Sequence, residues 1–94
     1  MLIVLATLRA QPAHAEAVHS VMAKLALHSR AERGCSAYRV FRCTDDPSVF
    51  ATYEEWAGAE DERRHMASAH VSEAFKHAGP LLAAAPDIRH FVEI

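Results

Sequence analysis

The hydrophobic positions divide the first third of the chain into one continuous apolar run and one stretch with helical spacing. Residues 1–9 are mostly apolar and include β-branched side chains, and the run ends shortly before Pro12. Such a run predicts a strand buried on both faces. From residue 13 to about residue 30, the larger apolar side chains fall at Val18, Val21, Met22 and Leu25. This spacing predicts a helix that packs on one side.

Two further apolar runs predict a pair of strands. Residues 35–43 are rich in aromatic and β-branched side chains, and the turn signal at residues 44–47 separates them from a similar run at residues 48–56. We expect these two strands to pair as a hairpin. A period of two along the second run places Glu54 and Trp56 on the same face, which is required if both line one pocket.

The last third of the chain predicts two helical pieces and a closing strand. Residues 59–66 begin with acidic side chains and end with basic ones, an order that complements a helix dipole. Ser68 is a favoured N-cap residue type, and Gly79 and Pro80 end the second piece. The inward stripe of that piece is expected at Val71, Ala74, Phe75 and Ala78. Residues 87–94 alternate and predict a fourth strand.

The predicted order is β-α-β-β-α-β, the ferredoxin-like arrangement of the α+β class. In this fold a four-stranded antiparallel sheet carries both helices on one face. The length of 94 residues is enough for one domain, residues 1–94, with a single core. No further element is left to cover the other sheet face, so we expect two subunits to pack sheet against sheet as a homodimer.

Charge, hydropathy and cysteine usage limit the classes of binding partner and the cellular compartment that we expect for this protein. The net charge is −2 and no basic stretch occurs, so nucleic acid is not expected as a partner. The apolar N-terminus falls well short of about 20 residues and has no positive leader, so no membrane segment or signal is expected. Cys35 and Cys43 lie about 26 Å apart along one extended run, too far to bridge each other within a subunit. A cytoplasmic location is therefore expected.

Seven histidines raise the question of a metal site. His14 and His19, like His65 and His70, are five residues apart, and on one continuous helix such pairs point about 140° away from each other. A helical metal pair has i, i+4 spacing instead. The sequence therefore predicts no metal ligands, and we expect His14, His19 and His28 to face solvent.

Candidate chemistry gathers where the third strand meets the following helix. The carboxylate of Glu54, the only Trp (Trp56), His65 and His70 lie within 17 residues of one another in the sequence. The meeting of a strand end and a helix commonly forms a small pocket. Structural roles are open as well: Trp56 can fill the core, Glu54 can pair with an Arg, and His70 can tie its helix to a strand. Tyr38 can simply place its hydroxyl at the sheet rim.

Several short motifs extend this pattern over nearly the whole chain. They are Glu32-Arg33-Gly34-Cys35, Tyr38, Asp46-Pro47, Phe50, Tyr53-Glu54-Glu55-Trp56, His65-Met66-Ala67-Ser68-Ala69-His70 and Phe75. Together they resemble the antibiotic-biosynthesis monooxygenase family of dimeric α+β barrels, and within it the small stand-alone proteins related to quinol monooxygenases.

The resemblance implies a homodimeric enzyme that oxidises electron-rich phenols or quinols with O2 and needs no flavin, metal or haem. It implies a pocket between the sheet and the helices. By this resemblance His65 and Glu54 are expected to be catalytic, and the substrate-binding residues are expected to be Trp56, Tyr38, Phe50 and His70.

The expected chemistry is coherent in physical terms. A deprotonated phenol or hydroquinone is a strong electron donor that can reduce O2 itself, so the protein needs only to position and deprotonate it. An imidazole, with an unperturbed pKa near 6.5, suits this task and makes His65 the expected base. Trp56 would offer an aromatic face to a flat ring, and Tyr38 would hydrogen-bond to the substrate oxygen. Glu54 would orient the imidazole or accept a substrate hydroxyl.

The sequence contains no Asn, and this departure narrows the expected function. Haem-degrading proteins that resemble this fold use Asn, Trp and His together, so haem cleavage is not expected, and the polyketide chemistry behind the family name is in doubt. Two alternatives stay open. One is an isomerase or detoxifying enzyme for a small carbonyl or signalling-sugar compound. The other is a non-catalytic dimer that binds a small ligand.

Overall fold

Four strands and three helices follow one another in a computed structural model that describes all 94 residues. The elements are β1 (Leu2–Arg9), α1 (Ala15–Arg30), β2 (Cys35–Arg42), β3 (Val49–Trp56), α2 (Ala59–Met66), α3 (Ala69–Ala78) and β4 (Asp87–Phe91). Short 3-10 helices at Pro12–His14 and Gly79–Leu81 precede α1 and follow α3. The predicted β-α-β-β-α-β order is confirmed, with its second helical region divided into two pieces.

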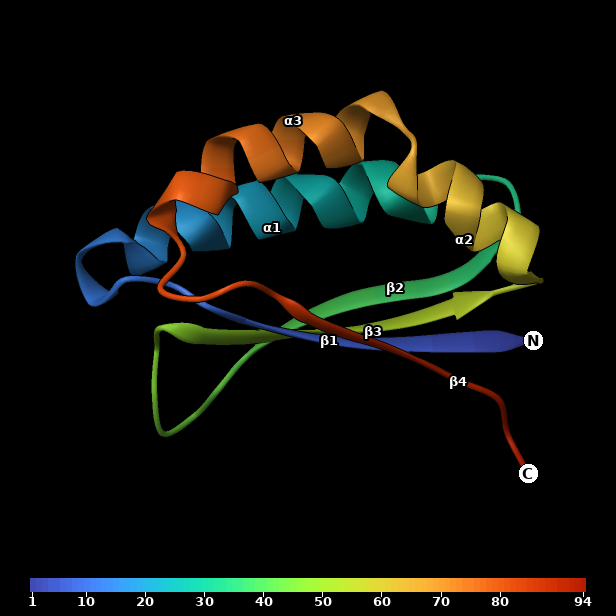
Figure 1. Cartoon of the computed structure of the whole chain (residues 1–94), viewed down its shortest axis with the longest axis horizontal. Helices are drawn as coiled ribbons and strands as arrows, with labels where there is room; N and C mark the ends of the chain where they lie inside the picture. The colour runs from blue at the N-terminus through green and yellow to red at the C-terminus, as the bar shows by residue number, and fades with distance from the viewer.

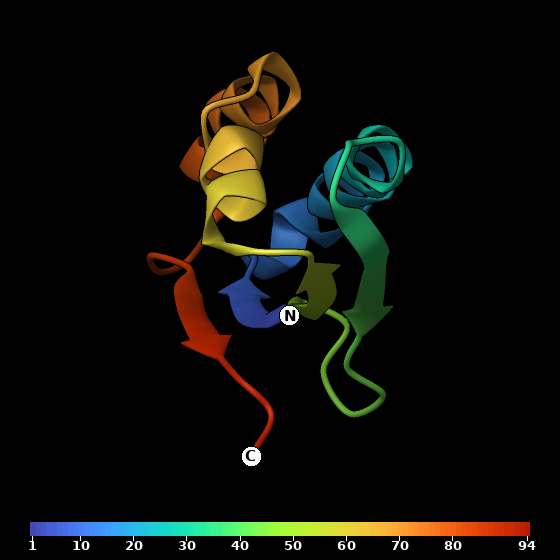
Figure 2. The ribbon, with the colours of Figure 1, turned by 90° about the vertical axis from the view of Figure 1, so that its right-hand side faces the viewer.

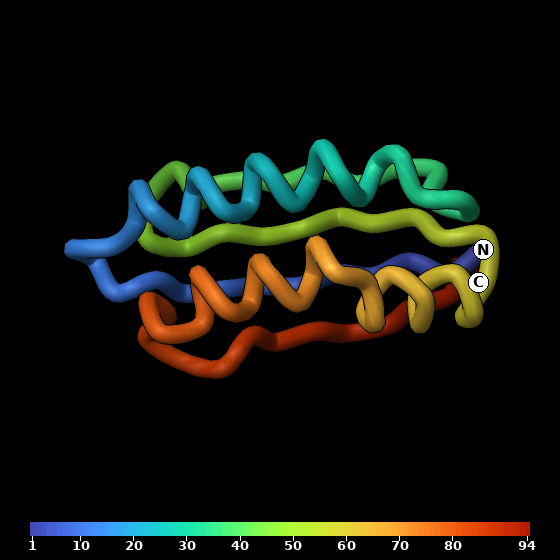
Figure 3. Tube along the Cα trace, turned by 90° about the horizontal axis from the view of Figure 1, so that it is seen from above, coloured from blue at the N-terminus to red at the C-terminus, as the bar shows by residue number.

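The strands form one antiparallel sheet in the order β2-β3-β1-β4. β1 and β3 pair from Leu2 opposite Trp56 to Arg9 opposite Val49, and β2 and β3 form the predicted hairpin. All three helices lie on one face of the sheet (Figure 1). α1 lies over the β2 side, and α2 and α3 lie over the β4 side (Figures 2 and 3). The α+β, ferredoxin-like fold is therefore confirmed.

Two strand predictions need correction. β1 was expected to be buried on both faces, but only Val4, Ala6 and Leu8 are buried, whereas Leu5 is 41% exposed. The reason is that one chain supplies helices to one sheet face only. β4 ends at Phe91 rather than at residue 94, because Phe91 already pairs with Ile3 near the start of β1. The last residues turn away from the sheet (Figure 1).

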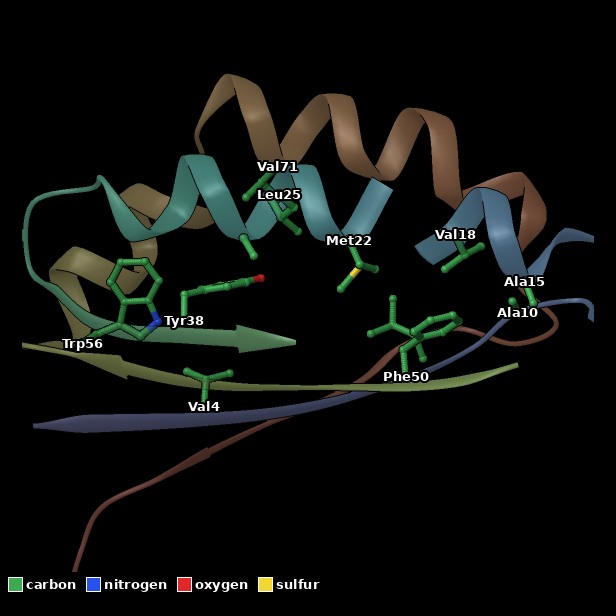
Figure 4. Close-up of a cluster of buried hydrophobic side chains, with 12 residues drawn as sticks. Val4, Ala10, Ala15, Val18, Met22, Leu25, Tyr38, Phe50, Trp56 and Val71 are labelled. Atoms are coloured by element: carbon green, nitrogen blue, oxygen red, sulfur yellow. The ribbon is translucent and has the colours of Figure 1, made fainter. Parts of the chain in front are cut away.

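The core lies between the sheet and the helices. Figure 4 shows its side chains, with Val18, Met22 and Leu25 of α1 directed at the sheet as predicted. Val21 is only partly buried. In α3, Val71 and Ala78 are buried, but Phe75 is 42% exposed and departs from the predicted inward stripe. Phe75 instead forms part of the wall of a cavity.

Two local features bring the α1–β2 loop and the second helical region together. Ser68 caps α3 as predicted, and its Oγ accepts the Val71 N–H at 3.4 Å, so the chain changes direction between α2 and α3. Gly34 has a φ of +86°, and an added Cβ there would collide with the side chain of Asp61 in α2. Only glycine permits this close approach. The loop that carries Glu32 is therefore packed directly against α2.

Candidate active site

A narrow cavity of about 50 Å³ lies between the sheet and the helices. Most of its lining is apolar, and five polar side chains contribute to it: Tyr38, Thr52, Glu54, Glu62 and His65. By the same measure one water needs about 10–15 Å³, so the cavity has room for a few waters. Binding of an aromatic ring therefore requires the walls to move apart.

Glu54 is a buried carboxyl group on the inward face of β3. Its Oε1 accepts the Trp56 indole N–H at 3.0 Å, and its Oε2 accepts the Thr52 hydroxyl at 2.8 Å. Alternation along β3 places all three side chains on one face, as the sequence predicts. Burial raises the pKa of Glu54, although the two hydrogen bonds and nearby His65 oppose that rise. Folding therefore favours the protonated form of this carboxyl group.

His65 is held by contacts on several sides. Its ring lies 4.7 Å from the Trp56 ring and 5.4 Å from the Tyr38 ring, measured between centroids. Its Nδ1 is 2.5 Å from Glu32 Oε2. Because an ionised carboxylate can only accept, Nδ1 carries the hydrogen, and Nε2 of the neutral ring is left as the acceptor. Nε2 has no hydrogen-bond partner within the chain.

Glu32 is a site residue that the sequence analysis did not assign. It lies in the loop between α1 and β2, and the same Oε2 that contacts His65 is 3.0 Å from His70 Nε2. The sequence did carry one signal, because Glu32 belongs to the motif Glu32-Arg33-Gly34-Cys35 on which the family resemblance rests. The motif does not tell which side chains Glu32 contacts in the folded chain.

Tyr38 contributes a hydroxyl beside these groups. Burial raises the pKa of Tyr38, and the nearby Glu54 carboxylate adds to the rise, so the phenol stays protonated as a donor. In Figure 4 its hydroxyl points away from Trp56, along the space beneath α1. The nearby Ser29 side chain partly opposes the rise in the pKa of Tyr38.

The structure brings some of the predicted site residues together and separates others. Tyr38, Glu54 and His65 all line the cavity. The other three predicted residues lie outside its lining. Trp56 is fully buried behind Glu54 and His65, and His70 is on the outer side of Glu32. Phe50 packs beneath the Arg42 guanidinium, whose central carbon is 5.0 Å from the centre of the ring. Their substrate-binding roles stay predictions.

Glu62 is a second residue that the sequence analysis missed. It lies in the acidic first turn of α2, to which the sequence analysis gave only a role in complementing the helix dipole, yet it is buried and lines the cavity. Its carboxylate lies 3.3 Å from His90 Nε2 of β4 and contributes to the raised pKa of Glu54. Two carboxyl groups and one imidazole therefore face the same space.

A family model described as antibiotic biosynthesis monooxygenase matches residues 1–77. The chain belongs to the antibiotic biosynthesis monooxygenase family. The family resemblance drawn from the motifs is thereby confirmed. No curated protein matches the sequence.

Several solved structures share the fold over almost the full length. Protein PA3566 of Pseudomonas aeruginosa is 29% identical, with a TM-score of 0.91, and the match covers 99% of this chain and 93% of that chain. A structure described as an antibiotic biosynthesis monooxygenase is 23% identical, with a TM-score of 0.96 and coverage of 100% and 99%. Rv0793 of Mycobacterium tuberculosis is 19% identical, with a TM-score of 0.93 and coverage of 99% and 94%. The last two likenesses show the fold alone.

Two further observations concern membrane-spanning segments and the state of the cysteines. No helix of this member of the family is both long and apolar enough to cross a membrane. Cys35 and Cys43 are both free thiols.

Replacing Glu54 by Gln should change how stability depends on pH. Because folding raises the pKa of Glu54, the folded state favours the protonated form, and stability is lost as pH rises from its unfolded pKa through its folded pKa. Gln keeps an oxygen for Trp56 and cannot ionise. Urea unfolding across a pH series should show E54Q gaining stability relative to wild type as pH increases.

The matched control is Glu55→Gln, one residue along β3 on the outer sheet face. Its difference from wild type should not grow with pH. A pH-independent difference for E54Q would contradict the buried-carboxyl assignment.

Proposed function

We propose that this protein is a cofactor-independent monooxygenase that oxidises a small quinol or phenol with O2. The observation that carries the proposal is His65, whose Nδ1 is tied to Glu32 while its ring lines the cavity with Nε2 unoccupied. A base held in one tautomer by a carboxylate is the arrangement that proton abstraction requires. Membership of the monooxygenase family supports the same reaction class.

In the proposed reaction, His65 Nε2 accepts the proton of a substrate hydroxyl. The resulting anion transfers one electron to O2, and the organic radical and superoxide combine to form a carbon–oxygen bond. Cleavage of the O–O bond leaves one oxygen atom in the product, and the other departs as water. For a simple phenol the products are a quinone and one water, which balances atoms and electrons with one O2.

Two other groups have roles in this scheme. The Tyr38 hydroxyl, kept protonated by burial, donates a hydrogen bond to the substrate oxygen as negative charge develops. Glu54, whose pKa is raised, supplies a proton to the oxygen that leaves as water. Trp56 holds both catalytic groups, because its N–H is bound to Glu54 and its ring packs on His65.

The cavity wall sets the size of the substrate. Met66 and Phe75 line the cavity and are both partly exposed, so their side chains can move outward with little loss of packing. Most of the remaining wall is also apolar, with five polar side chains on it, which suits a small flat ring with one or two hydroxyl groups. Larger substrates would require displacement of the helices.

The test is oxygen uptake by metal-free protein with a panel of hydroquinones and phenols, measured above the rate of spontaneous oxidation. With isotopically labelled O2, one labelled atom should appear in the product. Absence of uptake across the panel would contradict the proposal.

An isomerase or detoxifying enzyme for a small carbonyl or signalling-sugar compound is the second candidate. It is favoured by the buried carboxyl Glu54 beside His65, because these two groups can move protons within a substrate without O2. Anaerobic turnover of a dicarbonyl sugar, together with no oxygen uptake, would select this reaction. If neither assay shows turnover while a ligand stabilises the fold, the protein is a binding module.

We further propose that the protein functions in a reducing cytoplasm, and its two free thiols support this location.

We also propose that the protein forms a homodimer through the outer sheet face. The outer face of the sheet carries apolar side chains that one chain leaves uncovered, including Leu5, Phe41 and Phe91. Burial of this face between two copies would remove the apolar surface from water.

Replacing Leu5 by Asp should therefore weaken the dimer by at least about 30-fold, the equivalent of about 2 kcal/mol. Sedimentation over a concentration series measures this change. Leu27→Asp is the control, because Leu27 is 67% exposed on α1, which lies on the opposite face of the sheet from the proposed interface (Figure 1). A monomeric wild type, or equal effects of the two substitutions, would contradict the proposed interface.

A further inference from the structure

Three metal-ligating side chains from separate segments converge beside the candidate base. They are Glu32 of the α1–β2 loop, His65 of α2 and His70 of α3. Their ligand atoms, Glu32 Oε2, His65 Nδ1 and His70 Nε2, all lie within 4.8 Å of one another. The carboxylate oxygen is 2.5 Å from the first imidazole nitrogen and 3.0 Å from the second. One oxygen therefore contacts both rings.

The break in the helix makes this convergence possible. The expectation of no metal site assumed that His65 and His70 lie on one continuous helix, where five-residue spacing separates them by about 140°. In the structure α2 ends at Met66 and α3 starts at Ala69, with Ser68 capping the second helix. The change of direction turns both rings toward Glu32. The 140° separation expected from the sequence thus does not apply to His65 and His70.

We propose that Glu32, His65 and His70 bind a divalent transition-metal ion of the Zn²⁺ and Co²⁺ class. Two imidazoles and one carboxylate form a donor set that such ions prefer. Bonds of about 2.1 Å in tetrahedral geometry place ligand atoms about 3.4 Å apart. The Glu32 oxygen must therefore withdraw by about 1 Å or less from its present position, and a side chain on a loop can do so by rotation. A solvent molecule would complete the coordination.

The burial of the three ligands shows the side from which an ion would arrive. The His70 side chain is 24% exposed, whereas that of His65 is 3% exposed and Glu32 is intermediate. His70 also lines a surface cleft between α1 and α3. On this cleft the His28 ring stacks on His70 at 5.6 Å and restricts its orientation. The ion would reach Glu32 and His65 past His70, without passing through the apolar cavity.

Metal binding would have a direct effect on the proposed base, and this step rests on the proposed function. An ion on His65 Nδ1 displaces the hydrogen now shared with Glu32. The neutral imidazole then carries its hydrogen on Nε2, which becomes a donor and can no longer accept a proton. The site therefore excludes base catalysis while it is filled, and the ion acts as an inhibitor of the proposed oxidation.

The test uses full-length protein without a polyhistidine tag, freed of metal by a chelator. Calorimetry with Zn²⁺ and visible absorption with Co²⁺ should each show one ion bound per chain. Glu32→Gln and His70→Gln should each weaken binding at least about tenfold. His77→Gln is the matched control, because His77 lines the same cleft and contacts Glu73 at 3.1 Å but lies outside the cluster. Its affinity should equal that of wild type.

No binding by folded wild-type protein, or equal binding by all three variants, would overturn the proposed site. Because calorimetry and absorption need no turnover, they decide the question even if no oxidation is found. Inhibition of oxygen uptake at the concentration that fills the site supports both proposals. Binding with undiminished uptake supports the metal site and overturns the assignment of His65 as base.

Discussion

Replacing His65 by Gln should lower the rate of hydroquinone oxidation by about 10²- to 10⁴-fold in metal-free protein. Gln can keep a hydrogen bond to Glu32, so the loop and α2 should stay in place, but it offers no nitrogen that can accept a proton. The loss should appear mainly in kcat, measured with an oxygen electrode. His77→Gln, a change of the same kind on an exposed part of α3, should leave the rate unaltered.

The dependence on substrate acidity distinguishes a missing base from a damaged pocket. A more acidic phenol is already ionised at the assay pH and does not need His65 to remove its proton. The deficit of H65Q should therefore shrink as substrate pKa decreases. A deficit that is the same for all substrates, or activity close to that of wild type, would contradict the role of His65 as base.

Replacing Trp56 by Ala should destabilise the fold by about 3–5 kcal/mol, the usual cost of removing a large buried aromatic side chain. Trp56 is fully buried and contacts both Glu54 and His65. A small domain has a total stability of about 5–15 kcal/mol, so the variant should be close to unfolding. Urea denaturation measures the change.

Trp56→Phe is the companion variant, because it keeps an aromatic ring and removes the N–H that binds Glu54. It should cost about 1–3 kcal/mol, since one oxygen of a buried carboxyl group loses its partner. A loss below about 1 kcal/mol for W56A would show that the ring is not part of the core.

The sequence was sufficient for the fold because each element carries a clear periodic signal. Alternation along β3 correctly placed Phe50, Thr52, Glu54 and Trp56 on one inward face, and the cap at Ser68 was correctly identified. The extent of β4 could not be predicted in the same way. Its end depends on where its partner β1 begins, and not on the residues of β4 itself.

The candidate site was only partly predictable for a related reason. Alternation tells which side chains face the helices, but it does not tell which of them reach a cavity. Trp56 is large enough to pack fully against His65, so it lies behind the cavity wall and not in it. Glu32 and Glu62 act through neighbours that are distant in sequence, and these contacts depend on how a loop and a helix meet. Only the folded chain shows such contacts.

The close packing of Gly34 on Asp61 has a consequence for altering substrate selectivity. This contact fixes the loop and helix that carry Glu32 and His65, so any side chain added at Gly34 would disturb both ends of their hydrogen bond. The apolar wall formed by Met66, Phe75 and Leu82 is built from other positions. Libraries of variants that change only these wall residues can thus reshape the pocket while Glu32 and His65 keep their positions.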